Sequence, residues 1–139
     1  MKDIAKKANT MYLLEKYNMK ATKKFGQNFL IDLNVVQKIV DCTSIDQQTC
    51  VIEIGPGIGA LTEQLSYRAG HVVSYEIDIR LKDVLNESLQ ECTNVEVIFQ
   101  DFLTVDLKQV VHHYKQHYSK VCIVANLPYY ITSDILEHI

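Results

Sequence analysis

Four short apolar runs alternate along this chain with stretches of helical periodicity, and few fold classes accommodate such an alternation. The runs are CVIEI, HVVSYEI, VEVIF and VCIVA, at residues 50–54, 71–77, 95–99 and 121–125. Short apolar runs bounded by turns are typical of buried strands. Strands that alternate with helices through short connections are typical of a parallel, doubly wound sheet. The sequence therefore predicts an α/β fold.

The predicted helices lie before and between these strands. They are expected at about residues 3–18, 32–41, 60–69, 81–90 and 106–118, and another begins near Thr132. Asp32 is the expected cap of the second helix, and the segment KKFGQNFLID before it reads as a loop. The regular alternation of strand and helix thus begins only after the second helix.

The composition is that of one ordinary globular domain. The chain has 139 residues, of which 47% are hydrophobic and 22% are charged, and this length is enough for one sizeable core but short for a two-domain enzyme. There is no apolar run long enough for a membrane span, and the N-terminus carries charges where a signal peptide needs an apolar segment. We expect a cytoplasmic protein with no membrane partner.

The positive charges are concentrated in the first residues. Residues 1–24 contain seven lysines and two acidic residues, a net charge of +5, although the net charge of the whole chain is −3. A basic segment of this kind is suited to contact with nucleic-acid phosphates. A solvated helix face beside an acidic domain explains the same charges equally well, so charge alone does not decide between the two.

The cysteines and histidines do not predict a metal site or a disulfide framework. Cys42, Cys50, Cys92 and Cys122 form no C-x-x-C pair, so we expect buried free thiols. His112, His113 and His117 lie on one predicted helix, and the last two are one turn apart. No carboxylate or cysteine joins them at a ligand spacing, so we expect no bound metal.

Polar residues or glycines follow every predicted strand at its carboxyl end. They are Gly55, Gly57 and Gly59 after the first strand, Glu76 in the second, Asp101 after the third and Asn126 after the fourth. Ligands of open α/β sheets bind at this edge. Glycines let the backbone approach a ligand closely, and a carboxylate such as Glu76 can accept hydrogen bonds from both ribose hydroxyls of an adenosine-containing cofactor.

These features alone leave two kinds of cofactor open. The pattern Gly55-x-Gly57-x-x-Ala60 also satisfies the dinucleotide fingerprint, and Glu76 lies at the distance expected for a site that binds NAD. A nicotinamide-dependent oxidoreductase is therefore one alternative. Glu53, Asp101 and the motif NLPY after the fourth strand distinguish the chain from that class, because hydride transfer has no evident use for NLPY.

Taken together, the motifs resemble those of a known family. KKFGQNFLID, VIEIGPGIGALTEQL, YEID, QDFL and ANLPYYITS resemble, in order and spacing, the bacterial adenine dimethyltransferases of small-subunit ribosomal RNA, the kasugamycin-resistance type. The related macrolide-resistance methyltransferases of large-subunit RNA tend to have different residues at three positions. Pro56, Ile58 and Leu127 favour the small-subunit type.

The resemblance implies a Rossmann-like fold that uses S-adenosylmethionine. The implied cofactor-binding residues are Asn28, Leu30, Gly55, Gly57, Glu76, Asp101 and Asn126. Gly55 and Gly57 would lie under the cofactor, Glu76 would bind its ribose, and Asp101 would lie beside its adenine. Asn28 suits the methionine end, because an amide can donate to a carboxylate and accept from an ammonium group.

The motif NLPYY has a chemical interpretation within this family. The side-chain oxygen of Asn126 and the backbone carbonyl of Leu127 could accept both N6 hydrogens of a target adenine and orient its nitrogen towards the methyl group. Pro128 stiffens the turn. Tyr129 offers a face for an extruded base, and such stacking contributes roughly 1–3 kcal/mol. Tyr130 is better explained by packing.

The resemblance also implies an activity and a domain organisation. The implied activity is N6-dimethylation of adjacent adenosines near the 3′ end of 16S ribosomal RNA, acting on that RNA or on a pre-30S particle. Residues 1–24 would form a basic helix or arm, and residues 25–139 the N-terminal part of the catalytic domain. The sheet would stop after its fourth strand, with strand order 3-2-1-4, and the C-terminal strands and helical domain would be missing. A non-catalytic RNA-binding or ribosome-assembly module of the same fold is the other alternative.

Overall fold

A parallel four-stranded sheet forms the centre of the molecule. A computed structural model of the chain describes residues 2–19, 33–34, 37, 40 and 44–125. The sheet is built from β1 (Thr49–Ile54), β2 (His71–Glu76), β3 (Val95–Phe99) and β4 (Lys120–Ala125). Its strand order is β3-β2-β1-β4, and each neighbouring pair is parallel. The predicted α/β class and strand order are confirmed.

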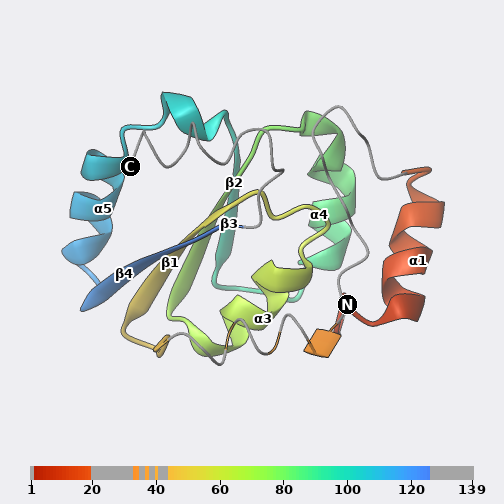
Figure 1. The fold of residues 1–139 in the computed structure, drawn as a ribbon, viewed down its shortest axis with the longest axis horizontal. Coiled ribbons are helices and arrows are strands. Elements are labelled where there is room, and N and C mark those ends of the chain that lie inside the picture. The colour runs from red at the N-terminus through yellow and green to blue at the C-terminus, as the bar shows by residue number, and fades with distance from the viewer. Residues whose placement is uncertain (1, 20–32, 35–36, 38–39, 41–43, 126–139) are drawn as a thin grey trace.

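Helices cover both faces of this sheet (Figure 1). They are α1 (Lys7–Lys16), α3 (Ala60–Arg68), α4 (Lys82–Ser88) and α5 (Leu107–Lys115), with two 3₁₀ turns, η1 (Ile79–Leu81) and η2 (Phe102–Thr104). Helices α3 and α4 lie on one face, with α1 outside them, and α5 lies on the other. The helices predicted between the strands are therefore confirmed, although α4 and α5 are shorter than expected.

Side-chain alternation along the central strand divides the core into two layers. On β1, Cys50, Ile52 and Ile54 pack with residues of β2 and the α5 side, whereas Val51 packs towards α3 and α4. This alternation follows from the two-residue repeat of a strand. Every residue of β1 is buried, as expected for a strand covered on both faces.

The N-terminal helix begins later than predicted. The sequence suggested a start near residue 3, but α1 begins at Lys7. Asp3 adopts a positive φ of 59°, which is incompatible with a regular helix, and Ile4 is fully buried. The N–H groups of Asp3 and Ile4 donate to Glu63 on α3, so a distant tertiary contact replaces the first helical turn.

Parts of the second predicted helix are described. Leu33, Asn34, Gln37 and Val40 are helical, within the predicted range 32–41, and Val40 is buried. The remainder of this helix, and the helix expected near Thr132, lie outside the described residues.

The cysteines only partly follow the prediction. Cys50, Cys92 and Cys122 are free thiols, but only Cys50 is buried. The prediction of burial is wrong for Cys92, which lies in the segment after α4, and for Cys122, which lies on β4, the last strand of the described sheet. Cys42 lies outside the described residues.

Candidate functional site

The loop that joins β1 to α3 is a turn built on glycines with left-handed backbone. Gly55, Gly57 and Gly59 have φ angles of 76°, 60° and 94°, a region that residues with a Cβ rarely adopt. A Cβ at Gly59 would also lie 3.0 Å from Leu89 Cδ2 and 3.2 Å from Ser88 Oγ. The loop therefore brings bare backbone to the carboxyl edge of the sheet, immediately before the start of α3.

Glu76, the last residue of β2, holds this loop. Its Oε1 accepts a hydrogen bond of 3.2 Å from the N–H of Gly57, and its Oε2 accepts one of 3.0 Å from the N–H of Asp78. Burial raises the pKa of Glu76 above its usual range, and these backbone bonds oppose that rise. Because each carboxylate oxygen has two acceptor sites, Glu76 keeps acceptor capacity for a further donor such as a ribose hydroxyl.

Glu53 is a second acidic group beneath the loop, on β1. It is fully buried, and its Oε1 accepts from the hydroxyls of Thr62 and Ser74. Its Oε2 has no hydrogen-bond partner among the described residues. Burial, together with the nearby charge of Glu76, raises the pKa of Glu53 to about 7, although the two hydroxyl bonds lower it. A buried acceptor without a partner is unusual in a folded protein, so Oε2 is an acceptor that a ligand or water could use.

Asp101 lies beyond the end of β3, next to β2 in the sheet. Its Oδ1 accepts from the N–H of Leu103 and caps η2. Ile77 and Leu103 follow the two acidic strand ends closely, and both are exposed, by 47% and 38%. Carboxylates next to aliphatic side chains suit a purine nucleoside, which presents amino and hydroxyl donors and an apolar ring face.

The structure brings some of the expected site residues together. Gly55, Gly57, Glu76 and Asp101 all lie at the carboxyl edge of the sheet, and Gly57 contacts Glu76 directly. Asn28, Leu30, Asn126, Leu127, Pro128 and Tyr129 lie outside the described residues.

Two features of this edge do not follow from the motifs. The unpaired oxygen of Glu53 depends on how α3 packs over β1, and no local pattern reveals it. Ile77 could have been noticed from the sequence, because it is an aliphatic residue directly after a strand-end carboxylate.

The described part of the chain shows neither a metal centre nor a membrane segment. Within it, no three His, Cys, Asp or Glu side chains are grouped to hold a metal ion. None of its helices is long and apolar enough to cross a bilayer.

Comparison with known proteins supports a family assignment by both sequence and fold. Residues 18–139 match the family described as ribosomal RNA adenine dimethylase. The ribosomal RNA small subunit methyltransferase A of Staphylococcus aureus strain Newman is 52% identical over 97% of this chain, which spans 46% of that relative. The curated relatives are thus more than twice as long as the matched region.

Two solved structures of similar fold are named as an rRNA methyltransferase and a dimethyladenosine transferase. The crystal structure of 23S rRNA methyltransferase ErmE is 37% identical, with a TM-score of 0.65, over 80% of this chain and 42% of that one. A dimethyladenosine transferase from Plasmodium falciparum is 26% identical, with a TM-score of 0.59, over 75% of this chain and 35% of that one. The sheet, the glycine loop and the sequence match together show that this chain belongs to the ribosomal RNA adenine dimethylase family.

Proposed function

We propose that this chain forms the cofactor-binding part of an S-adenosylmethionine-dependent enzyme that dimethylates N6 of adjacent adenosines near the 3′ end of 16S ribosomal RNA. The observation that carries the proposal is the contact between Glu76 and Gly57. It places a buried carboxylate with spare acceptor capacity against a loop of bare backbone. Family membership and the name of the Staphylococcus aureus relative support the choice of substrate.

The residues at this edge fit S-adenosylmethionine. Glu76 would accept from the ribose hydroxyls, Asp101 from the adenine amino group, and Ile77 would lie against the purine ring. The buried, unpaired oxygen of Glu53 would accept from a water. Gly55 and Gly57 would allow the cofactor close to the backbone, and we assign Asn28, Leu30 and Asn126 to the methionine end on motif grounds alone.

The chain's own residues would then hold the target base. S-adenosylmethionine, when bound, supplies an electrophilic methyl group. Asn126 and the carbonyl of Leu127 would accept the two N6 hydrogens of an extruded adenine, and this would orient the nitrogen. Pro128 would fix that turn, and Tyr129 would stack on the base.

The partner we propose is small-subunit ribosomal RNA, free or in a pre-30S particle, in the cytoplasm. We keep the division into a basic segment, residues 1–24, and the first part of a catalytic domain, residues 25–139, as part of this proposal. Lys2 and Lys7 are exposed and could contact phosphates, whereas Lys6 is paired with Asp3 at 3.4 Å.

Removing the Glu76 carboxylate tests the cofactor assignment. We expect Glu76→Ala to weaken S-adenosylmethionine binding, measured by calorimetry, by about 1.5–3 kcal/mol, the usual contribution of hydrogen bonds to a charged group. Asp83→Ala, which removes an exposed carboxylate from α4, is the matched control and should leave the affinity unchanged. An unaltered dissociation constant in Glu76→Ala would refute the assignment.

A second ligand separates the proposal from the oxidoreductase alternative. The melting temperature of the unaltered chain should rise with S-adenosylmethionine and stay constant with NAD, because only a ligand of the native state shifts it. A response to NAD alone would favour the oxidoreductase.

To separate an enzyme from a non-catalytic module, the longer protein should be assayed for transfer of labelled methyl groups to under-methylated small-subunit RNA.

A further inference from the structure

The N-terminal segment is attached to both helices that flank the glycine loop. We call residues 2–17 the N-terminal brace. All of it precedes residue 18, where the match to the family model begins. It nevertheless contributes Ile4, Ala5 and Leu13 to the core layer of α3 and α4. The brace therefore lies outside the region that the family model matches, yet it packs against the helices beside the glycine loop.

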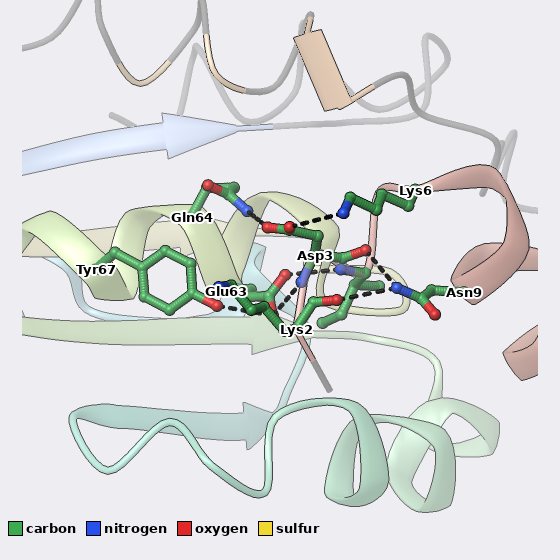
Figure 2. Close-up of polar contacts among 8 residues, drawn as sticks. Lys2, Asp3, Lys6, Asn9, Glu63, Gln64 and Tyr67 are labelled. Atoms are coloured by element: carbon green, nitrogen blue, oxygen red, sulfur yellow. Dashed lines mark hydrogen bonds and ion pairs between the residues drawn. The ribbon is translucent and has the colours of Figure 1, made fainter.

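The first attachment is Glu63, which lies one turn inside α3 (Figure 2). Its Oε1 accepts from the N–H of Ile4 at 2.7 Å, and its Oε2 accepts from the N–H of Asp3 and the hydroxyl of Tyr67, both at 3.0 Å. Glu63 is only 1% exposed. Its own N–H donates to the carbonyl of Gly59 at 2.9 Å, so one residue joins the brace to the end of the glycine loop.

Further bonds fix the turn that reaches Glu63. Asn9 Nδ2 donates to the carbonyls of Lys2 and Asp3, Thr10 Oγ1 donates to the carbonyl of Ile4, and Gln64 Nε2 donates to Asp3 Oδ1. These contacts hold Asp3 at its positive φ, a conformation that persists only where the surroundings impose it. The brace therefore meets α3 in one defined geometry.

The second attachment is Glu87 on α4. Lys16 Nζ and the Tyr17 hydroxyl both donate to Glu87 Oε1, at 2.5 Å and 2.6 Å. The next residue, Ser88, is fully buried and donates from its hydroxyl to the carbonyl of Ile58, in the glycine loop, at 2.8 Å. Consecutive residues of α4 therefore hold the far end of the brace and the middle of the loop.

We propose that the N-terminal brace holds the glycine loop in its cofactor-binding conformation by joining α3 to α4, and that Glu63 and Glu87 are positioning residues for cofactor binding. The inference rests on the proposed function for the identity of the cofactor. A loop of glycines has unusually high conformational freedom, so fixing its two flanking helices removes freedom that the ligand would otherwise have to remove on binding. The brace acts on affinity without touching the ligand.

Substitutions at the exposed end of the brace test this without disturbing the core. Lys16→Met removes the charged donor to Glu87, and Lys16→Arg keeps one. In Lys16→Met we expect the amides of Gly57 and Gly59 to exchange hydrogen at least about threefold faster. We also expect S-adenosylmethionine to bind at least about threefold more weakly, an effect of the size expected for a residue that acts on the site through its neighbours. Lys16→Arg should restore both values. Exchange within β1, β2 and β3 should stay unchanged.

Glu63→Gln tests the other end, with Asp83→Asn as the control of equal charge change. An amide nitrogen cannot accept from the N–H groups of Asp3 or Ile4, so this variant should loosen the same loop amides, whereas Asp83→Asn should not. Two outcomes would overturn the proposal. One is loop exchange that stays unchanged in both Lys16→Met and Glu63→Gln. The other is exchange that rises equally in the strands, which would make the brace a general stabiliser.

The hydrogen-exchange experiment also separates this proposal from the proposed function, because it needs no cofactor. If the unaltered chain binds no S-adenosylmethionine, the proposed function fails, and loop exchange in Lys16→Met alone decides the role of the brace.

Discussion

The carboxyl group of Glu53 is enclosed by β1, β2 and α3. Its Oε1 accepts hydrogen bonds from two hydroxyl groups, whereas its Oε2 has no hydrogen-bond partner among the described residues. Ser74 is its direct neighbour on β2 in the register of the sheet, and Thr62 projects from the first turn of α3. Burial raises the pKa of Glu53 from 4.5 to about 7. The folded protein therefore disfavours the charged form of this residue.

This shift predicts how stability depends on pH. Between pH 4.5 and about 7 the folded state retains a proton on Glu53 that the unfolded chain has released. The free energy of unfolding should therefore fall as pH rises through this window and level off above it. The contribution of Glu53 to this fall is at most on the order of 3 kcal/mol.

Glu53→Gln should remove that contribution. We expect urea unfolding of the cofactor-free chain at pH 5 and pH 8 to give a smaller difference in Glu53→Gln than in the unaltered chain. The difference between the two pH values is the diagnostic quantity, because the amide nitrogen would also lack a described partner and could lower stability at both. Equal differences in the two proteins would contradict the assigned titration.

At the scale of elements, the start of α3 depends on Gly59. Its φ of 94° costs a residue with a Cβ about 1–2 kcal/mol, and the added Cβ would also press on Leu89 at 3.0 Å. We expect Gly59→Ala to lower the free energy of unfolding by at least about 1 kcal/mol, measured in urea.

A second substitution separates strain from crowding in that result. Leu89→Ala removes the side-chain atoms nearest to the new Cβ. If crowding contributes, Gly59→Ala should cost less in the Leu89→Ala background than in the unaltered chain. If the cost is the same in both, it comes from backbone strain and from the contact with Ser88 Oγ at 3.2 Å, and not from Leu89. A Gly59→Ala protein of unchanged stability would show that the loop adopts another conformation.

Most elements were predictable because their determinants are local. The four strands and α3, α4 and α5 have apolar periodicity within their own residues, and the strand-order expectation came from the family resemblance. The start of α1 was wrong because Asp3 and Ile4 are fixed by Glu63, about 60 residues away. Local patterns carry no information on such a contact.

The candidate site was predictable to the same extent. Gly57 and Glu76 could be placed at one edge because the carboxyl ends of parallel strands meet there. The open oxygen of Glu53 could not be foreseen, since it depends on which hydroxyls α3 and β2 bring to it. Asp78 and Asp101 were not expected to cap 3₁₀ turns, although each is followed two residues later by the N–H that it binds.

At the scale of the whole molecule, the strand β4 is less buried than its neighbour β1. All residues of β1 are buried, whereas β4 is half-buried or exposed along its length. Among the described residues, β4 pairs only with β1. A groove of about 760 Å³ runs between α5 and β4, and its lining includes Lys108, Val111, His112 and Ile123. Within the described part of the chain, this side therefore presents apolar surface and strand backbone that has no second partner.

A strand edge without a partner among the described residues predicts association between copies of this chain. Unpaired N–H and C=O groups on an edge strand are a template for another strand, and burying apolar surface contributes about 25 cal/mol per Å². We expect light scattering and sedimentation to show an average mass that rises with concentration.

Ile123→Lys should lower this association, because a lysine on an edge strand opposes pairing. Leu103→Lys is the matched control, since Leu103 is 38% exposed and Ile123 is 37% exposed, but Leu103 belongs to η2 and not to the strand β4. Equal effects of the two substitutions would mean that added charge, and not the strand edge, governs association, and a strictly monomeric unaltered chain would show that the edge of β4 is protected.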